Sequence, residues 1–446
     1  MSLTSPLRHP DTRDPAVMSR RAWWLLGLNL LIPGSAQLLA GDRRWGRFAV
    51  AATFTLWAAA LAALLLFVLW RPAALTLATN PIVLWIGQLA LLFYAVLWLA
   101  TTLNAFTLVR LVRTGPRARI PIAVFTVLSI VLTTGTAGYA ALLTGVGRDA
   151  LGSVFADGTF VEPIDGRYTI LLLGGDAGDD RIGLRPDSMS LVSIDAATGA
   201  VTMIGIPRNL YNAPFAEGSP LWDAWPRGFD CGDDCLLAYL YPWAEEHLEL
   251  YPDAEANGST PALEAMSDAV EGVTGLPVQF TVLIDMNGFA QLIDALGGVV
   301  VTVDEPVLLG INGGPVVGEI AAGEQRMDGA TALWYARSRY NLTDFDRMAH
   351  QRDIQEAMLQ QLEPGVVLTR FQAIAEASSG LVRTDIPQSM LGVLSDLAVQ
   401  SRDNEIVRLE LVPPLVDNVT PDFAAVHTIV AEAVAPRPTP TSTSAP

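Results

Sequence analysis

Long apolar runs dominate the first third of the chain. Four of them, joined by short arginine-bearing loops, cover residues 23–40, 48–70, 81–109 and 120–143. The last three are long enough to cross a bilayer as helices. The first carries Asn29 and is broken at Pro33 and Gly34, which predicts a re-entrant or short segment instead of a full span. We therefore predict an arm over residues 1–21 and a membrane region with three crossings over residues 22–145.

Arginines between the apolar runs orient this membrane region. They form three groups: Arg20 and Arg21; Arg43, Arg44 and Arg47; and Arg110, Arg113, Arg117 and Arg119. Arginine-rich loops favour the cytoplasmic side of a membrane. All three groups reach that side only if the first apolar segment returns to the side from which it started, because four full crossings would put one group on the wrong side. The chain beyond residue 145 is therefore expected outside the cell.

The pattern changes after a stalk predicted over residues 146–167. Strand-like runs then alternate with helical periods: strand at 168–175, two strands joined by the turn AATGA at 188–209, strand, helix and strand at 278–306, helices at 329–337 and 345–362. This order predicts the α/β class, with a mixed central sheet covered by helices. We expect a polar insertion at about residues 212–261, a C-terminal part of the same domain over residues 366–434, and a disordered Pro, Ser and Thr tail over residues 435–446.

Charge separates this second part from the membrane region. The chain has 28 basic residues, all of them arginine, against 46 acidic residues, and a net charge of −18. Nearly all of the acidic residues lie beyond residue 148. A domain this acidic would be repelled by nucleic acid, whose binding proteins carry basic surfaces. Against that background residues 332–353 hold four arginines, which indicates a local site for an anion such as phosphate.

The spacing of polar residues predicts where these arginines lie. Thr343 followed by Asp346 is typical of a helix start, with Asp346 as a capping residue and Asp344 at the threshold. On the helix that follows, Arg347 and Gln351 share a face because they are four residues apart.

Two further positions in this segment carry different expectations. Arg337 and Arg339 are two residues apart where the preceding helix runs out, so both can face one ligand only if the backbone there is not regular helix. Arg352 falls on a neighbouring face of the second helix, where we expect a solvated surface residue or an ion pair with one of the abundant carboxylates.

Two cysteines lie in the predicted insertion, as FDCGDDC. Outside the cell, nearby cysteines more often form a disulfide than stay free, and a metal site with two cysteines would lack further ligands. We therefore predict a disulfide between Cys231 and Cys235. The four histidines are scattered and give neither a zinc-site spacing nor a catalytic triad.

Four stretches in order resemble the LytR-CpsA-Psr family. They are residues 170–212, 284–306, 323–339 and the arginine-rich ARSRYNLTDFDRMAHQRD at 336–353. The resemblance implies a catalytic domain over about residues 168–365, held outside a bacterial membrane. It implies transfer of a glycopolymer (teichoic-acid-like, capsular or another wall polysaccharide) from a polyprenyl-pyrophosphate carrier to peptidoglycan, with Mg²⁺ at the pyrophosphate. The expected partners are thus this lipid-linked donor, the peptidoglycan acceptor and the lipid bilayer.

The resemblance also assigns roles to individual residues. The catalytic set is Arg208, Arg337, Arg339, Arg347 and Asp344. Arg185 and Gln351 join the four arginines in holding the pyrophosphate. Asp176 and Asp187 match the positions that hold Mg²⁺, a hard cation that prefers one or two carboxylates plus phosphate and water. Asp179 or Asp180 would serve in place of Asp176. Asn209 departs from the family, where an aspartate commonly follows the strand-end arginine.

Two other functions remain compatible with these residues. One is a pyrophosphatase that uses water as the acceptor. The other is a non-catalytic protein that binds lipid carriers and regulates wall assembly. The complete set of arginines and aspartates favours an enzyme, because simple binding would tolerate the loss of the metal pair.

Overall fold

The computed structural model describes residues 7–156, 158–176, 184–232, 235–310, 312–361, 382–402 and 404–435. The chain forms two compact units, Met1–Asp149 and Ala150–Pro446. The predicted tail at residues 435–446 lies outside the described residues except for its first position.

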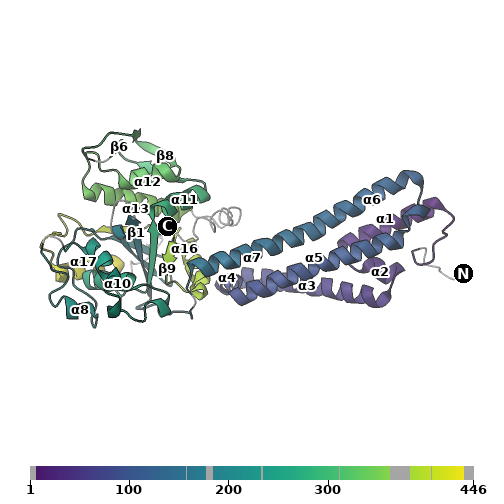
Figure 1. Ribbon diagram of the computed structural model, residues 1–446, viewed down its shortest axis with the longest axis horizontal. Helices are drawn as coiled ribbons and strands as arrows, with labels where there is room; N and C mark the ends of the chain where they lie inside the picture. Colours follow the sequence, from purple (N-terminus) through teal and green to yellow (C-terminus); the bar gives the residue numbers. More distant parts are fainter. Residues whose placement is uncertain are drawn as a thin grey trace, which may run out of the picture. The chain divides into compact units, whose positions relative to one another are not determined.

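The first unit is helical. Its helices are α1 (Pro15–Leu31), α2 (Ser35–Ala40), α3 (Arg43–Leu69), α4 (Arg71–Thr79), α5 (Pro81–Val109), α6 (Pro116–Ile130) and α7 (Thr136–Val154). Among them are three helical stretches long and apolar enough to cross a membrane: Arg43–Leu69, Pro81–Arg113 and Pro116–Val154. Figure 1 shows α3, α5 and α6 running in the same general direction. They match in place the three crossings that the apolar runs predict.

The first apolar segment is broken where the sequence indicates. Helix α1 ends at Leu31, α2 begins at Ser35, and Gly34 between them has a φ of 94°. A Cβ at Gly34 would lie 2.5 Å from the Cβ of Ala49 on α3, so only glycine fits this turn. Gln37 of α2 is buried and donates to the carbonyl oxygen of Thr101 at 2.7 Å. The segment therefore folds back as two short helices, and its predicted re-entry into the membrane remains a prediction.

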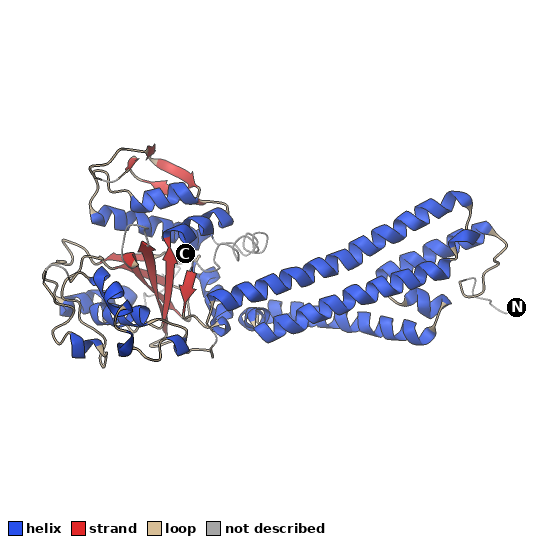
Figure 2. Ribbon diagram, in the orientation of Figure 1, coloured by secondary structure: helices blue, strands red, loops and turns tan. Residues whose placement is uncertain are grey.

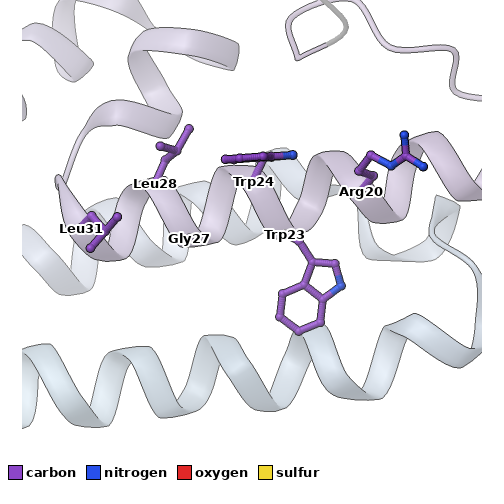
Figure 3. Close-up of a pocket in the computed structure, with 6 residues that line it drawn as sticks. All are labelled: Arg20, Trp23, Trp24, Gly27, Leu28 and Leu31. Atoms are coloured by element: carbon purple, nitrogen blue, oxygen red, sulfur yellow. The ribbon is translucent and has the colours of Figure 1, made fainter.

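A pocket of ≈ 360 Å³ lies along α1 in this unit. It is lined by one arginine, two tryptophans, a glycine and two leucines: Arg20, Trp23, Trp24, Gly27, Leu28 and Leu31. In Figure 3 the ring of Trp23 points toward a neighbouring helix, where it meets Phe125 edge to face at 5.3 Å. Arginine and tryptophan beside leucine are typical of a helix at a membrane interface. These side chains offer no group for acid, base or nucleophilic chemistry.

The predicted stalk begins as helix. Helix α7 continues to Val154, so the first residues of the predicted stalk are helical. The glycines at 147 and 152 each cost only about 1 kcal/mol inside a helix, and the long helix tolerates them.

A six-stranded sheet forms the centre of the second unit (Figure 2). Its order is β10 (Val407–Glu410), β3 (Val201–Gly205), β2 (Arg185–Asp195), β1 (Arg167–Asp176), β4 (Phe280–Asp285) and β9 (Val382–Thr384). Strands β1 and β4 are parallel, as are β3 and β10, and the other pairs are antiparallel. The predicted mixed sheet and the predicted β2–β3 hairpin are both confirmed.

Helices cover both faces of this sheet. Alternate residues of β1 and β2, such as Leu171 and Leu191, pack against α10 (Pro261–Thr274) and α17 (Phe423–Val434). The opposite face, with Leu172 and Val192, meets α13 (Asp344–Gln361), while α16 (Leu391–Ser401) covers the end near Tyr168. The period of two along each strand therefore fills a core on either side.

A smaller layer adds to this core, at the top of Figure 1. It contains α11 (Met286–Leu296), α12 (Gly329–Arg337) and the strand pairs β5 (Val299–Val303) with β8 (Gly323–Met327), and β6 (Val307–Leu309) with β7 (Gly318–Ile320). The run at 278–306 is strand, helix and strand as predicted, but β5 pairs with β8 and not with the central sheet. The two glycines that end α11, both with φ of 89°, turn the chain away from that sheet.

The insertion after β3 is part of the main core. It holds α8 (Leu221–Ala224) and α9 (Leu240–Glu245), and buries Phe215, Phe229 and Tyr241 against α10. The disulfide between Cys231 and Cys235 is present as predicted. The segment predicted as a polar insertion, at about residues 212–261, thus contributes aromatic residues to the core.

Candidate functional site

Polar side chains gather where β1 and β3 end and β2 begins. We call five of them the arginine cluster: Arg208, Arg339, Arg347, Asp187 and Asp344. Asp187 lies on β2, Arg208 follows β3, Arg339 follows α12, and Asp344 and Arg347 belong to the first turn of α13. Residues that are far apart in the sequence therefore meet at one end of the sheet.

An irregularity in β2 presents Asp187 to this site. The register pairs Pro186 with Gly175 and Ser188 with Gly174, so Asp187 is an extra residue with no partner on β1. Such a bulge turns one side chain out of the regular alternation and is frequent beside active sites.

Arg208 joins the two carboxylates of the cluster. Its Nη1 lies 2.5 Å from Oδ1 of Asp187, and its Nε lies 2.9 Å from Oδ2 of Asp344. Burial lowers the pKa of Arg208, but the two carboxylates outweigh burial and the pKa is raised overall. The guanidinium therefore stays charged and fixed in direction.

Arg347 is the most buried member, with only 2% of its side chain exposed. Its Nη1 donates to the backbone carbonyl of Asp187 at 2.8 Å and its Nη2 lies 3.1 Å from Oδ2 of Asp344. The Nε of Arg347 is buried and makes no hydrogen bond within the described residues. A buried donor without a partner is costly, so this N–H is an unsatisfied position within the cluster.

Arg339 is the most open arginine of the cluster, with 34% of its side chain exposed. Its distances to Asp187 and Asp344 are 3.8 and 3.6 Å, longer than those of the other two arginines. The backbone reaches this position because Ser338 leaves the helix, with a φ of −57° and a ψ of 136°, and the amide of Arg339 donates to Gly310. The non-helical geometry that the sequence requires at this point is confirmed.

The cluster carries more positive than negative charge. Three guanidinium groups face two carboxylates. Burial lowers the pKa of Arg339, and the nearby cations Arg347 and Arg208 lower it further. Burial raises the pKa of Asp344, but the three arginines together outweigh burial and lower it. The effect of Arg347 and Arg208 on Arg339 favours the binding of an additional anion, since an anion relieves the repulsion among the arginines.

Arg185 extends the site toward the insertion. It lies on β2 two residues before Asp187, and its guanidinium stacks over the ring of Tyr239 at 4.7 Å. The segment before Tyr239 follows the Arg208 loop, with the amide of Ala238 donating to the carbonyl oxygen of Arg208 at 3.0 Å. A guanidinium over an aromatic face is held by a cation–π interaction. Nothing in the sequence pattern pointed to Tyr239.

Three further predicted site residues lie on α13, at the end of α12 and at the end of β1. Gln351 is buried and donates to the carbonyl oxygen of Ala336 at 3.2 Å, so its amide joins α12 to α13 instead of facing solvent. Arg337 is the exposed last residue of α12. The backbone of Asp176 ends β1 opposite Arg185, while its side chain, Asp179 and Asp180 lie outside the described residues.

Of the two expectations for Arg352, the ion pair with a carboxylate is confirmed and the solvated surface position is wrong. Only 1% of its side chain is exposed, and its Nε lies 3.2 Å from Oε1 of Glu410 on β10. Helix α13 packs one face on β2, and Arg352 belongs to that face, where its other nitrogens bond to Ser190, Gln355 and the carbonyl oxygen of Met189. The helical start itself is as predicted, because Thr343 and Asp346 exchange hydrogen bonds in both directions.

The described part of the chain contains no group of three or more histidine, cysteine, aspartate or glutamate side chains that could hold a metal. Mg²⁺ requires fewer protein ligands, since one or two carboxylates with phosphate and water suffice. Asp187 fits in part: Oδ1 is taken by Arg208 at 2.5 Å, while among the described residues Oδ2 has only the longer ion-pair contact of 3.8 Å with Arg339. One carboxylate oxygen is therefore open to a hard cation.

Comparison with known proteins gives concordant matches. Residues 238–423, within the second unit, match the LytR_cpsA_psr family. The polyisoprenyl-teichoic acid–peptidoglycan teichoic acid transferase TagU of Halalkalibacterium halodurans is 28% identical over 222 residues, 49% of this chain and 61% of that protein. The probable cell wall biosynthesis protein LcpB of Corynebacterium glutamicum is 30% identical over 210 residues, 46% of this chain and 41% of that protein.

The chain thus spans 61% and 41% of the length of these two relatives. Among solved structures, the LytR-Csp2A-Psr enzyme from Actinomyces oris matches 63% of this chain and 96% of its own, with 20% identity and a TM-score of 0.42. The matched family region contains α10 to α13 and the C-terminal strands. Three of the five residues of the arginine cluster, Arg339, Asp344 and Arg347, lie in it. Residues 238–423 of this chain are therefore a region of the LytR_cpsA_psr family.

Proposed function

We propose that this protein transfers a wall glycopolymer from a polyprenyl-pyrophosphate carrier to peptidoglycan, forming a phosphodiester link in cell-wall assembly. The observation that carries the proposal is the surplus of fixed arginines in the cluster, three guanidinium groups against two carboxylates. A relative with 28% identity bears the name of a teichoic acid transferase acting on peptidoglycan, which supports the same reaction class.

In this reaction a hydroxyl of the acceptor attacks the phosphorus that bears the glycopolymer. A new P–O bond forms, the bridging P–O bond of the pyrophosphate breaks, the hydroxyl loses its proton, and polyprenyl phosphate leaves. Negative charge grows on the leaving phosphate, and preorganised cations lower the barrier by stabilising it. We assign this task to Arg208 and Arg339, which are fixed by ion pairs and yet partly open.

Arg347 and Arg185 serve the same ligand in other ways. The buried Nε of Arg347, which has no hydrogen-bond partner among the described residues, would donate to a phosphate oxygen. Arg185 is held over Tyr239 at the side of the insertion, where it would meet the far phosphate. Arg337, exposed at the end of α12, is proposed to bind the donor from the open side.

We propose that Asp187, together with Asp176, holds Mg²⁺ at the pyrophosphate. The metal would neutralise charge on the two phosphates. Asp187→Ala should abolish the increase in pyrophosphate affinity that Mg²⁺ produces, as measured by calorimetry with the full chain. An equal effect of Mg²⁺ on parent and variant would show that the metal binds elsewhere.

We propose that the protein is a multi-pass membrane protein with its second unit outside the cell. Both cysteines of the chain are joined in the disulfide, so a new cysteine provides a unique thiol. In intact cells Gly158→Cys should react with a membrane-impermeant thiol reagent, whereas Arg44→Cys should react only after lysis. The reverse pattern would contradict this topology.

The proposed reaction is tested by supplying the purified full chain with a synthetic polyprenyl-pyrophosphate sugar and peptidoglycan fragments. Mass spectrometry should detect a phosphodiester-linked product that depends on the acceptor. Release of sugar phosphate at the same rate without an acceptor would instead identify a pyrophosphatase. Saturable donor binding with neither product would identify a carrier-binding regulator.

A further inference from the structure

The C-terminal segment, to which the sequence assigns no role, reaches the arginine cluster through a single carboxylate. Glu410 is the last residue of strand β10, and it pairs across the sheet with Gly205, the last residue of β3. Although 26% of its side chain is exposed, both carboxylate oxygens are buried. A buried carboxylate needs a counter-charge, and Arg352 of α13 supplies it at 3.2 Å.

Arg352 in turn contacts the strand that carries Asp187. Its Nη2 donates to the carbonyl oxygen of Met189 at 3.1 Å, and its Nη1 bonds to the hydroxyl of Ser190. The same Met189 oxygen accepts the amide of Ile206 at 3.1 Å, two residues before Arg208. One backbone oxygen therefore joins β2, the chain leaving β3, and helix α13.

The carboxylate of Glu410 also lies close to the backbone of Gly205. A Cβ added at Gly205 would lie 2.6 Å from Cδ of Glu410, so the carboxylate lies close over the backbone of β3 and would have to shift if a larger residue replaced this glycine. Gly205 lies three residues before Arg208. The position of this carboxylate is thus tied to the start of the Arg208 loop.

We propose that Glu410 is a positioning residue for the arginine cluster and acts through Arg352. The pair locks together the three elements that supply Asp187 (β2), Arg208 (after β3), and Asp344 with Arg347 (α13). It touches no substrate itself. This inference rests on the proposed function only for its effect on turnover, since the geometry of an anion site can also be measured by binding alone.

A second arginine provides a matched control. Arg408 also joins β10 to α13, with its guanidinium 2.7 Å from Asp353 and 2.5 Å from Glu356. Its side chain is 40% exposed, and these two ion pairs connect its guanidinium to α13, not to β2. If both residues merely attached β10 to α13, substitutions of Arg408 and Glu410 would have the same effect on the arginine cluster. If Glu410 positions the cluster, its substitution has the larger effect on anion binding.

The experiment compares Glu410→Gln and Arg408→Gln in the purified full chain. We expect Glu410→Gln to weaken the binding of inorganic pyrophosphate, measured by calorimetry, about 10-fold and to lower kcat for transfer by about 10- to 100-fold, because small misplacements of reacting groups carry costs of this size. Arg408→Gln should leave both quantities within about 2-fold of the parent, since it is an exposed pair. Equal pyrophosphate affinities in the two variants would overturn the proposal.

A third variant guards against loss of the fold. Arg352→Met combined with Glu410→Gln removes both charges, so no buried ion is left alone and the melting temperature should stay near that of the parent. Pyrophosphate affinity should nevertheless fall about 10-fold, because the links to Met189 and Ser190 are gone; parent-like affinity would refute the inference. Failure of the parent to transfer glycopolymer would count against the proposed function, while the affinities would still decide the role of Glu410.

Discussion

The arginine cluster and the ion pairs around β10 are built from the same two chemical groups, with opposite balance. The cluster has three arginines and two carboxylates. Around β10, Arg352 and Arg408 face Glu410, Asp353 and Glu356, two arginines against three carboxylates. Only the first arrangement has positive charge to spare for an anion. In the second arrangement the carboxylates already balance the charge of both arginines.

Burial alone does not separate the two regions. Arg347 and Arg352 lie five residues apart on α13, and their side chains are 2% and 1% exposed. What differs is the partner: Arg347 shares Asp344 with two other arginines, whereas Arg352 faces Glu410. An arginine is a candidate for ligand binding when the carboxylates around it are outnumbered.

The largest effect on stability should come from Arg352. Arg352→Ala leaves Glu410 buried without its partner, and breaking such a pair typically costs about 3–5 kcal/mol. We expect a loss of that size in the free energy of unfolding of the full chain in detergent, followed by tryptophan fluorescence in denaturant. A loss no larger than that of Arg408→Ala would contradict the assignment of Arg352 to the core.

The comparison extends to a carboxylate that is not held by an arginine. Asp385 accepts hydrogen bonds from the amide and hydroxyl of Thr281 at 2.6 and 2.9 Å, and burial raises its pKa to about 6. Asp344, among three arginines, has a lowered pKa. A raised pKa means that the stabilising contribution of Asp385 is complete below about pH 3.8 and is lost as pH rises through 6.

This shift predicts a pH-dependent term on the order of 3 kcal/mol in the stability of the second unit. Asp385→Asn should remove the term, so that the parent loses stability relative to the variant as pH rises from 4 to 7. Melting temperatures of parent and variant across this range provide the measurement. Parallel curves would show that Asp385 does not titrate there.

The smallest effect should come from the exposed pairs of Arg408. Arg408→Gln removes contacts to Asp353 and Glu356 at the surface, where an ion pair contributes about 0–1 kcal/mol. Salt should reduce even this difference, since exposed charges are screened. A decrease of more than about 2 kcal/mol in the free energy of unfolding would contradict the difference between the buried pair of Arg352 and the exposed pairs of Arg408.

Sequence periodicity was sufficient for the elements that build the site. Alternation in β1 to β3 and the capping pair Thr343 and Asp346 each depend on residues close in the chain, and these elements form as expected. The two edge strands, β9 and β10, have three and four residues, too few to show a period. Arg352 was misplaced for a related reason: its partner Glu410 comes from one of those short strands.

The same limit applies to the site. The arginines could be recognised from their density, and the non-helical step at Ser338 from the spacing of Arg337 and Arg339. The stacking of Arg185 on Tyr239 and the hydrogen bond from Gln351 to Ala336 could not be predicted, because contacts with an insertion and with a neighbouring helix leave no local pattern.

The account depends on the arginines acting as fixed donors and not as diffuse charge. Lysine keeps the charge at a position but offers a point charge instead of a planar fork. Loss of one preorganised donor typically costs about 2.7–4 kcal/mol, a rate reduction of about 100- to 1,000-fold. The deciding measurement is the transfer rate at saturating lipid donor for Arg208→Lys and Arg339→Lys beside Arg408→Lys. We expect losses approaching that range for the first two and a change within about 2-fold for the third, whereas equal, small effects at all three positions would contradict the account.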